Sequence, residues 1–285
     1  MSEFVLPQAP GNFVLAAGQR IHYIEAGDKK APALLLIHGL LDSIQAFRLV
    51  RDELAEHYHV FALDLPGHGY SERNPSFSMS LPDQAEVVAD FLKKVKVKSC
   101  RVLGHSMGGG IAIVLASRYP KLVKKLILAS TISYPFNKPL KGKVALIPHL
   151  GQYVVRFLFN RWLIKDYLQK EVYFDISCMS DEDTDIMWAN FKAPESRMAM
   201  HKAILAIEDV DWLPAEARKI KAPTRIIWGE EDNAVPVALG YRLEADIPGA
   251  RLDVFKRCGH MVLCENPAEV KRIAISFFSD EKKKT

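Results

Sequence analysis

Short, continuous apolar runs alternate with amphipathic stretches along most of the chain. Leu34-Leu35-Leu36-Ile37 is the clearest of these runs, and unbroken hydrophobicity is typical of a strand that is covered on both faces. A mostly parallel sheet between two layers of helices is therefore predicted. The predicted central strands are residues 33–38, 60–64, 100–104, 125–130, 224–228 and 252–255.

Two further strands and the flanking helices follow from the same pattern. Residues 13–17 and 21–26 predict an antiparallel edge around a Gly18-Gln19 turn. Amphipathic periodicity predicts a helix after each central strand. These helices are predicted over residues 45–56, 81–95, 107–118, 236–245 and 267–278.

The alternation stops between residues 131 and 213, where proline punctuates helical pieces and no strand pattern appears. The prolines are Pro135, Pro139, Pro148 and Pro194. We therefore predict two domains: an α/β core made of residues 1–130 and 214–285, and a helical lid inserted as residues 131–213. Ligands of open α/β sheets bind at the carboxyl ends of the strands, which this lid would cover.

One lid segment, residues 152–165, is apolar around most of a helical circumference. Gln152, Arg156 and Asn160 form a narrow polar stripe at four-residue spacing. The favoured interpretation is a helix packed on both the core and a substrate pocket. The alternative is peripheral contact with a membrane surface, aided by Arg156, Arg161 and Lys165.

Composition narrows the class of protein. The 285 residues carry a net charge of +4 with scattered basic residues, too little to predict a nucleic-acid partner. Neither a secretory leader nor a membrane-spanning run is predicted. Four cysteines lack metal-ligand spacing, so we expect reduced thiols, no metal and a cytoplasmic location. A disulfide between Cys258 and Cys264 is a minor alternative.

The most informative motif is Gly104-His105-Ser106-Met107-Gly108, where a predicted strand turns into a predicted helix. This G-x-S-x-G pattern in this context is the nucleophile elbow, which projects a serine hydroxyl above the sheet edge. A serine needs a base to take its proton, and the base needs a third group to orient it. Ser106 is therefore the candidate nucleophile.

Both partners follow in the expected chain order, acid and then histidine. Asp232 comes after the strand ending in Trp228-Gly229, and His260 comes after the last strand. We predict His260 as general base and Asp232 as the carboxylate that orients it, in preference to the neighbouring Glu230 and Glu231.

The loop Ile37-His38-Gly39-Leu40 supplies a fourth part of the predicted active site, beside Ser106, Asp232 and His260. The backbone N–H groups of Leu40 and Met107 are predicted to form an oxyanion hole. Gly39 would let the backbone approach the substrate, and His38 would brace the loop by hydrogen bonding.

With these motifs, the chain resembles the α/β-hydrolase superfamily with a helical cap, and the resemblance covers roughly residues 20–280. The matching motifs are His38-Gly39-Leu40, residues 64–71, residues 104–109, residues 228–236 and Cys258-Gly259-His260. The resemblance implies an α/β-hydrolase fold and serine hydrolase chemistry, usually on esters, with no metal or organic cofactor. Haloalkane dehalogenases and epoxide hydrolases of this fold carry an aspartate where Ser106 stands.

We expect a carboxylic-ester hydrolase that acts through an acyl-enzyme on apolar small-molecule esters of short to medium chain length. Three alternatives remain: a carbon–carbon bond hydrolase, a lipase at membrane surfaces, and a non-catalytic ligand-binding module. Carbon–carbon hydrolases generally show a tryptophan after the catalytic histidine, whereas Met261 follows His260 here. The intact set of Ser106, Asp232 and His260 argues against the binding module.

Overall fold

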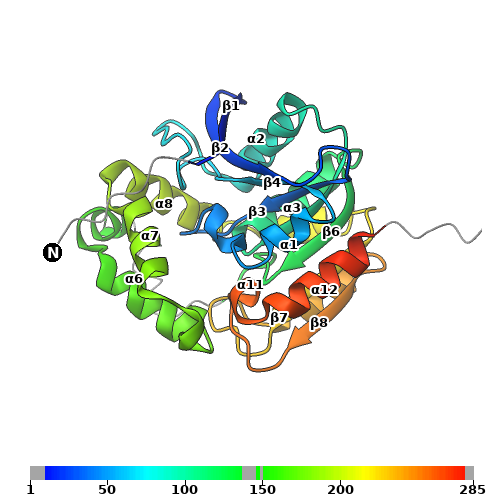
Figure 1. The fold of residues 1–285 in the computed structure, drawn as a ribbon. Coiled ribbons are helices and arrows are strands. Elements are labelled where there is room, and N and C mark those ends of the chain that lie inside the picture. The colour runs from blue at the N-terminus through cyan, green and yellow to red at the C-terminus, as the bar shows by residue number, and fades with distance from the viewer. Residues whose placement is uncertain (1–9, 137–145, 148–149, 280–285) are drawn as a thin grey trace, which may run out of the picture.

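The computed structural model describes residues 10–136, 146–147 and 150–279, which form an eight-stranded sheet flanked by helices. The strands lie in the order β1-β2-β4-β3-β5-β6-β7-β8 (Figure 1). β1 and β2, and β2 and β4, pair antiparallel, and every later pair is parallel. The strands are β1 (Asn12–Ala16), β2 (Gln19–Ala26), β3 (Ala33–Ile37), β4 (His59–Leu63), β5 (Cys100–His105), β6 (Val123–Ala129), β7 (Thr224–Gly229) and β8 (Arg251–Phe255). The predicted fold class is confirmed.

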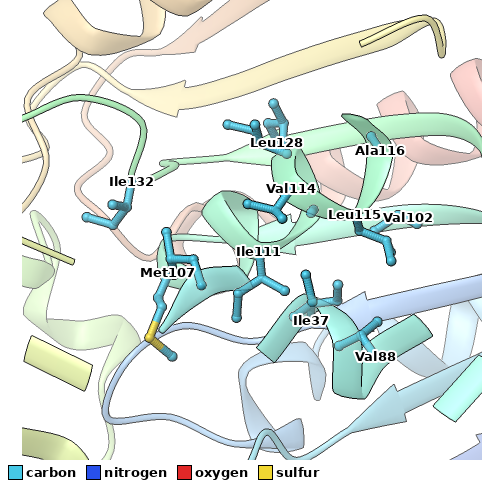
Figure 2. Packing of buried hydrophobic residues seen from close by; sticks show 14 of the residues in the cluster. Ile37, Val88, Val102, Met107, Ile111, Val114, Leu115, Ala116, Leu128 and Ile132 are labelled. Carbon is cyan, nitrogen blue, oxygen red and sulfur yellow. The ribbon is translucent and has the colours of Figure 1, made fainter. Parts of the chain in front are cut away.

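Helices cover both faces of the sheet, and adjacent strand residues point to opposite layers. In β3, Leu35 and Ile37 join the cluster beneath α2 and α3, whereas Leu34 and Leu36 join the cluster beneath α1 and α12. Figure 2 shows side chains of α3 packed against strand residues of the first cluster. These core helices are α1 (Arg51–Ala55), α2 (Leu81–Lys94), α3 (Met107–Arg118), α10 (Ala238–Asp246), α11 (Val262–Glu265) and α12 (Pro267–Phe278).

Between β6 and β7 the described residues form helices and no strand. We call residues 150–213 the helical insertion. In Figure 1 its helices α6, α7 and α8 gather on one side of the molecule. Its elements are α5 (Leu150–Tyr153), η3 (Val154–Leu158), α6 (Arg161–Tyr167), η4 (Leu168–Val172), η5 (Ile176–Cys178), α7 (Asp181–Phe191) and α8 (Pro194–Ala206). The helix α9 (Leu213–Ala217) starts where the insertion ends and leads back to β7. The lid boundaries at 131 and 213 stay a prediction, and its residues 137–145 and 148–149, with Pro139 and Pro148, lie outside the described residues.

The helix predicted over residues 45–56 is wrong as a single element. A 3₁₀ turn, η1 (Ile44–Phe47), precedes the short helix α1. The connecting bonds run from Arg48 N–H to the Gln45 carbonyl and from Val50 N–H to the Phe47 carbonyl, both at three-residue spacing. At three residues per turn, the buried Ile44, Phe47 and Val50 lie on one face, whereas in an α-helix Val50 would lie about 120° from Ile44.

The single helix predicted over residues 152–165 is also wrong. α5 widens into the π-helix η3, and the chain then leaves helical geometry at Phe159 and Asn160. Asn160 is extended, with φ −144°, and its side chain accepts a hydrogen bond from Leu163 N–H, so it starts α6 instead of continuing a polar stripe. The first turn likewise falls one residue earlier than predicted, at Ala17-Gly18, both with positive φ.

Candidate active site

Ser106 stands at the junction of β5 and α3. Its backbone has φ 54° and ψ −119°, and positive φ is rare for residues other than glycine. The strain is held by backbone bonds on both sides. Ser106 N–H donates to the Ala129 carbonyl at 2.9 Å, and Ile132 N–H donates to the Ser106 carbonyl at 3.1 Å. The hydroxyl is thereby fixed on a tight turn at the carboxyl end of the sheet.

Two glycines allow the surrounding chain to close around this serine. A Cβ on Gly108 would lie 2.2 Å from the Ile37 carbonyl oxygen, so only glycine lets α3 approach β3 this closely. A Cβ on Gly39 would lie 2.9 Å from Ser106 Cβ. The loop after β3 therefore runs directly beside the candidate nucleophile.

His260 and Asp232 form a buried pair at the same sheet edge. His260 Nδ1 lies 2.8 Å from Asp232 Oδ2. The second carboxylate oxygen, Oδ1, accepts from Ala234 N–H at 3.0 Å and from Val235 N–H at 2.7 Å, which fixes the plane of the carboxylate. Among the described residues no protein atom hydrogen-bonds His260 Nε2. The pair thus presents one free ring nitrogen.

The two neighbouring glutamates do not reach His260. The Glu231 carboxylate accepts from Cys258 N–H at 2.9 Å, and the Glu230 side chain is exposed. Glu231 N–H also donates to the Cys258 carbonyl at 3.0 Å. Glu231 therefore joins the loop after β7 to the loop that carries His260.

The predicted oxyanion donors lie beside the elbow. Met107 is the first residue of α3, and Leu40 follows Gly39. Within the described part of the chain, neither N–H group donates to a protein atom. His38 Nδ1–H donates to the Gly39 carbonyl at 2.7 Å, and its Nε2 accepts from Leu65 N–H at 2.9 Å. Burial lowers the pKa of His38, so it stays neutral and holds this loop in place.

Three contacts around His260 were missed by sequence reasoning. His105 Nε2 lies 3.0 Å from the His260 carbonyl oxygen, and the two rings are 4.9 Å apart. His260 N–H donates to the carbonyl of Val172 in the helical insertion at 2.7 Å. Glu265 accepts from Gly259 N–H on one oxygen and from Phe174 N–H and Asp175 N–H on the other. These contacts tie the His260 loop to both the elbow and the insertion, and no local motif signals them.

The helical insertion contacts the loops that carry His260 and Leu40, and both candidate catalytic residues are buried. Ser106 is 7% exposed and His260 is 6% exposed. An apolar cluster of Val155, Phe191 and Met200 in the insertion packs on Leu40 and Leu41 of the core. A small cavity of about 30 Å³ lies nearby, between the loop after β3, the insertion and Met261. The side chains that cover the Leu40 loop are therefore apolar.

Metal sites, membrane-spanning helices and disulfides are absent from the described residues. They contain no group of three metal-ligating side chains placed to hold an ion. They also contain no helix long and apolar enough to cross a membrane. All four cysteines are free, so the alternative of a Cys258–Cys264 disulfide is wrong, and burial raises the pKa of the Cys264 thiol to about 11.

Comparison with known proteins gives consistent results. The sequence model of the family described as "alpha/beta hydrolase fold" matches residues 32–267. The uncharacterized hydrolase YugF of Bacillus subtilis is 32% identical over 251 residues, which covers 88% of this chain and 91% of YugF.

Two solved structures are similar over nearly the whole chain. The meta-cleavage product hydrolase CumD of Pseudomonas fluorescens matches with a TM-score of 0.82 and 25% identity, over 94% of this chain and 97% of CumD. A membrane phospholipase A, a bacterial virulence factor, matches with a TM-score of 0.79 and 27% identity, over 93% of this chain and 84% of its own.

Proposed function

Because the chain belongs to the alpha/beta hydrolase fold family, we propose that it is a serine hydrolase that cleaves carboxylic esters through an acyl-enzyme. The observation that carries the proposal is the His260–Asp232 pair, which keeps one ring nitrogen without a protein partner among the described residues, together with Ser106 on its strained turn. Contact between His105 and His260 joins the two halves of this arrangement.

The reaction follows from the groups present. Ser106 Oγ attacks the ester carbonyl carbon while His260 Nε2 takes the hydroxyl proton. Asp232 accepts the Nδ1–H hydrogen bond and stabilises the imidazolium that forms. The oxyanion lies against the N–H groups of Leu40 and Met107, which have no protein acceptor within the described residues. His260 then protonates the departing alcohol, and water repeats the sequence on the acyl-enzyme.

The substrate class follows from the surroundings of Leu40. Val155, Phe191 and Met200 cover this loop with apolar side chains, a surface that suits an acyl chain better than a charged group. We therefore propose apolar esters of short to medium acyl length. Similarity to a phospholipase A, which is an ester hydrolase by name, supports ester chemistry.

A direct experiment combines fluorophosphonate labelling with turnover of p-nitrophenyl esters of increasing chain length. Wild-type protein is expected to be labelled and to turn over chains up to about ten carbons, and Ser106→Ala is expected to lose both signals. Folded wild-type protein with neither signal would contradict the proposal.

Carbon–carbon bond hydrolysis is the second candidate, favoured by the similarity to a meta-cleavage product hydrolase over 94% of the chain. The residue after His260 is Met261 instead of the tryptophan generally found in that class. Loss of absorbance of a vinylogous ring-fission product tests this activity. Labelling of Ser106 without ester turnover, together with decay of that product, would replace the ester assignment.

A further inference from the structure

Ile147 and the first half of the helical insertion expose an unusual number of large apolar side chains. Fourteen large hydrophobic side chains of the described residues are exposed, and nine of them lie between Ile147 and Ile176. The most exposed is Trp162, at 68%. Scattered exposed apolar side chains are normal, but a concentration on one segment marks an interaction surface.

Five of these side chains share a short stretch, and we call them the outer patch. They are Leu150, Tyr153, Phe157, Leu158 and Trp162, with exposed fractions between 47% and 68%. α5 and η3 form one uninterrupted helical run, on which the Tyr153 and Phe157 rings lie 4.9 Å apart. Trp162 follows on the first turn of α6, just beyond the Asn160 cap.

Packing within the molecule does not account for the outer patch, because other residues of the same elements serve that purpose. Val155 is 3% exposed and packs on Phe191, and Ile164 is fully buried beside Met261. The elements that carry the outer patch therefore have two apolar sides, one toward the candidate active site and one toward solvent.

The charged residues near the outer patch indicate which kind of partner it would bind. Residues 150–165 contain three basic residues and no acidic one. Arg161 pairs with Asp185, and Lys165 pairs with Asp181, so those charges are offset. Arg156 lies over the Phe157 ring, its guanidinium carbon 5.3 Å from the ring centroid, and has no carboxylate partner within the described residues.

We propose that the outer patch docks this protein on the surface of an anionic phospholipid bilayer. Exposed Trp, Tyr and Phe beside an unpaired arginine match the boundary between acyl chains and headgroups, where apolar bodies are buried and the cation meets lipid phosphate. The contact is peripheral, with the α5–η3 run lying along the interface. It goes beyond the proposed hydrolase activity and does not depend on it.

In the docked protein, one side of the insertion would contact the lipid and the other side would stay over the candidate active site. The inner side contributes the Val172 carbonyl that holds His260 N–H at 2.7 Å. An apolar ester dissolved in the lipid would thus be concentrated on the side of the molecule where the insertion lies.

The test is co-sedimentation with vesicles of phosphatidylcholine containing about 30 mol% phosphatidylglycerol, compared with pure phosphatidylcholine. The variant is the triple Tyr153→Ser/Phe157→Ser/Trp162→Ser, and a second variant is Arg156→Glu. The matched control replaces three exposed apolar residues of the core, Leu15→Ser/Leu49→Ser/Tyr241→Ser. Circular dichroism and urea unfolding establish that each variant is folded.

Wild-type protein, Ser106→Ala and the core control are expected to bind the anionic vesicles. The triple variant should bind at least about tenfold more weakly, and Arg156→Glu should be intermediate. Absence of wild-type binding, equal binding to neutral vesicles, or retained binding in the triple variant would overturn the proposal. A wild-type dimer in size-exclusion chromatography that the triple variant converts to monomer would also overturn it, because the patch would then be a subunit interface. Ser106→Ala lacks the proposed nucleophile but keeps the outer patch, so its binding tests membrane docking independently of the proposed hydrolase activity.

Discussion

Two buried histidine–aspartate pairs of nearly the same geometry lie in this molecule. His260 Nδ1 is 2.8 Å from Asp232 Oδ2, and His22 Nδ1 is 2.7 Å from Asp64 Oδ2. The second pair even has a serine nearby, because Ser71 Oγ accepts from His22 N–H at 2.8 Å. Residue types and pair distance alone would not tell the two sites apart.

The difference lies in what the remaining polar atoms do. His22 Nε2 faces the Pro10 carbonyl, and the Ser71 hydroxyl donates to the Asp64 carbonyl at 2.6 Å. Asp64 also accepts from Ile44 N–H and Tyr70 N–H. The His22–Asp64 group is thus a closed network that joins β2, β4 and η1. The His260–Asp232 pair keeps one nitrogen without a protein partner among the described residues, and its imidazole ring lies 4.9 Å from that of His105, the residue before the strained Ser106. Reactivity requires that unfilled position.

The largest expected contrast comes from removing each histidine. We predict that His260→Ala lowers kcat for ester hydrolysis by at least about 10⁴-fold, in addition to the loss of stability that follows from leaving Asp232 buried without its partner. His22→Ala should leave kcat of the folded protein within about threefold and cost about 3–5 kcal/mol of stability, because Asp64 is left buried without its partner. Ester turnover and urea unfolding measure the two effects. A folded His22→Ala protein without turnover would remove the distinction between the pairs.

The carboxylates give the next contrast. Asp232→Asn places an amide N–H against His260 Nδ1 and disfavours the productive tautomer, so we predict a fall in kcat of about 10³–10⁴-fold. Asp64→Asn should instead lower the free energy of unfolding by about 3 kcal/mol and leave turnover nearly unchanged. Glu231→Gln is the matched control for the first variant. Loss of turnover in Glu231→Gln equal to that in Asp232→Asn would show that the orienting acid is misassigned.

The sequence predicted the parts of this comparison that depend on local pattern. Continuous apolar runs placed the central strands within about two residues, because burial on both faces leaves a direct signature. Ser106, Asp232 and His260 each follow a strand, so parallel topology brings them to one edge. The elbow motif alone identified the strained turn.

The rest depends on contacts between distant residues. His22 and Asp64 are 42 positions apart, and nothing near either one marks the network. The Val172 carbonyl that holds His260 belongs to an insertion whose helices have apolar residues on two sides, so periodicity gave no face to orient them. The four-residue spacing of Gln152, Arg156 and Asn160 hid the break, because it suggested one continuous helix where Asn160 in fact caps α6.

Two further histidines provide a stability contrast that depends on pH. Burial lowers the pKa of both His68 and His105 to about 3. Below pH 6.5 these two histidines are protonated in the unfolded chain but stay unprotonated in the folded protein. The free energy of unfolding therefore falls as the pH falls toward 3. The expected loss is up to about 1.4 kcal/mol per pH unit for each histidine. Urea unfolding of wild type and His68→Gln between about pH 6.5 and 5.5 measures it, and the variant should lose about 1 kcal/mol less stability than wild type over this range. An unchanged slope in that variant would contradict the assignment.

His22 is predicted to act in the opposite direction, and this is the smallest effect. Burial opposes its charge, but the Asp64 carboxylate and the Pro10 carbonyl outweigh burial, so the pKa of His22 is raised. A folded-state pKa above the unfolded value stabilises the protein fully below pH 6.5, and that stabilisation is lost as the pH rises through the folded-state pKa. The difference in free energy of unfolding between wild type and His22→Gln should therefore be larger at about pH 6 than at about pH 9, by about 1.4 kcal/mol for each unit by which the pKa is raised. Because other titrating groups are common to both proteins, they cancel in this difference. A difference that is flat with pH would mean that His22 is neutral in the folded protein and that its network is held by hydrogen bonds alone.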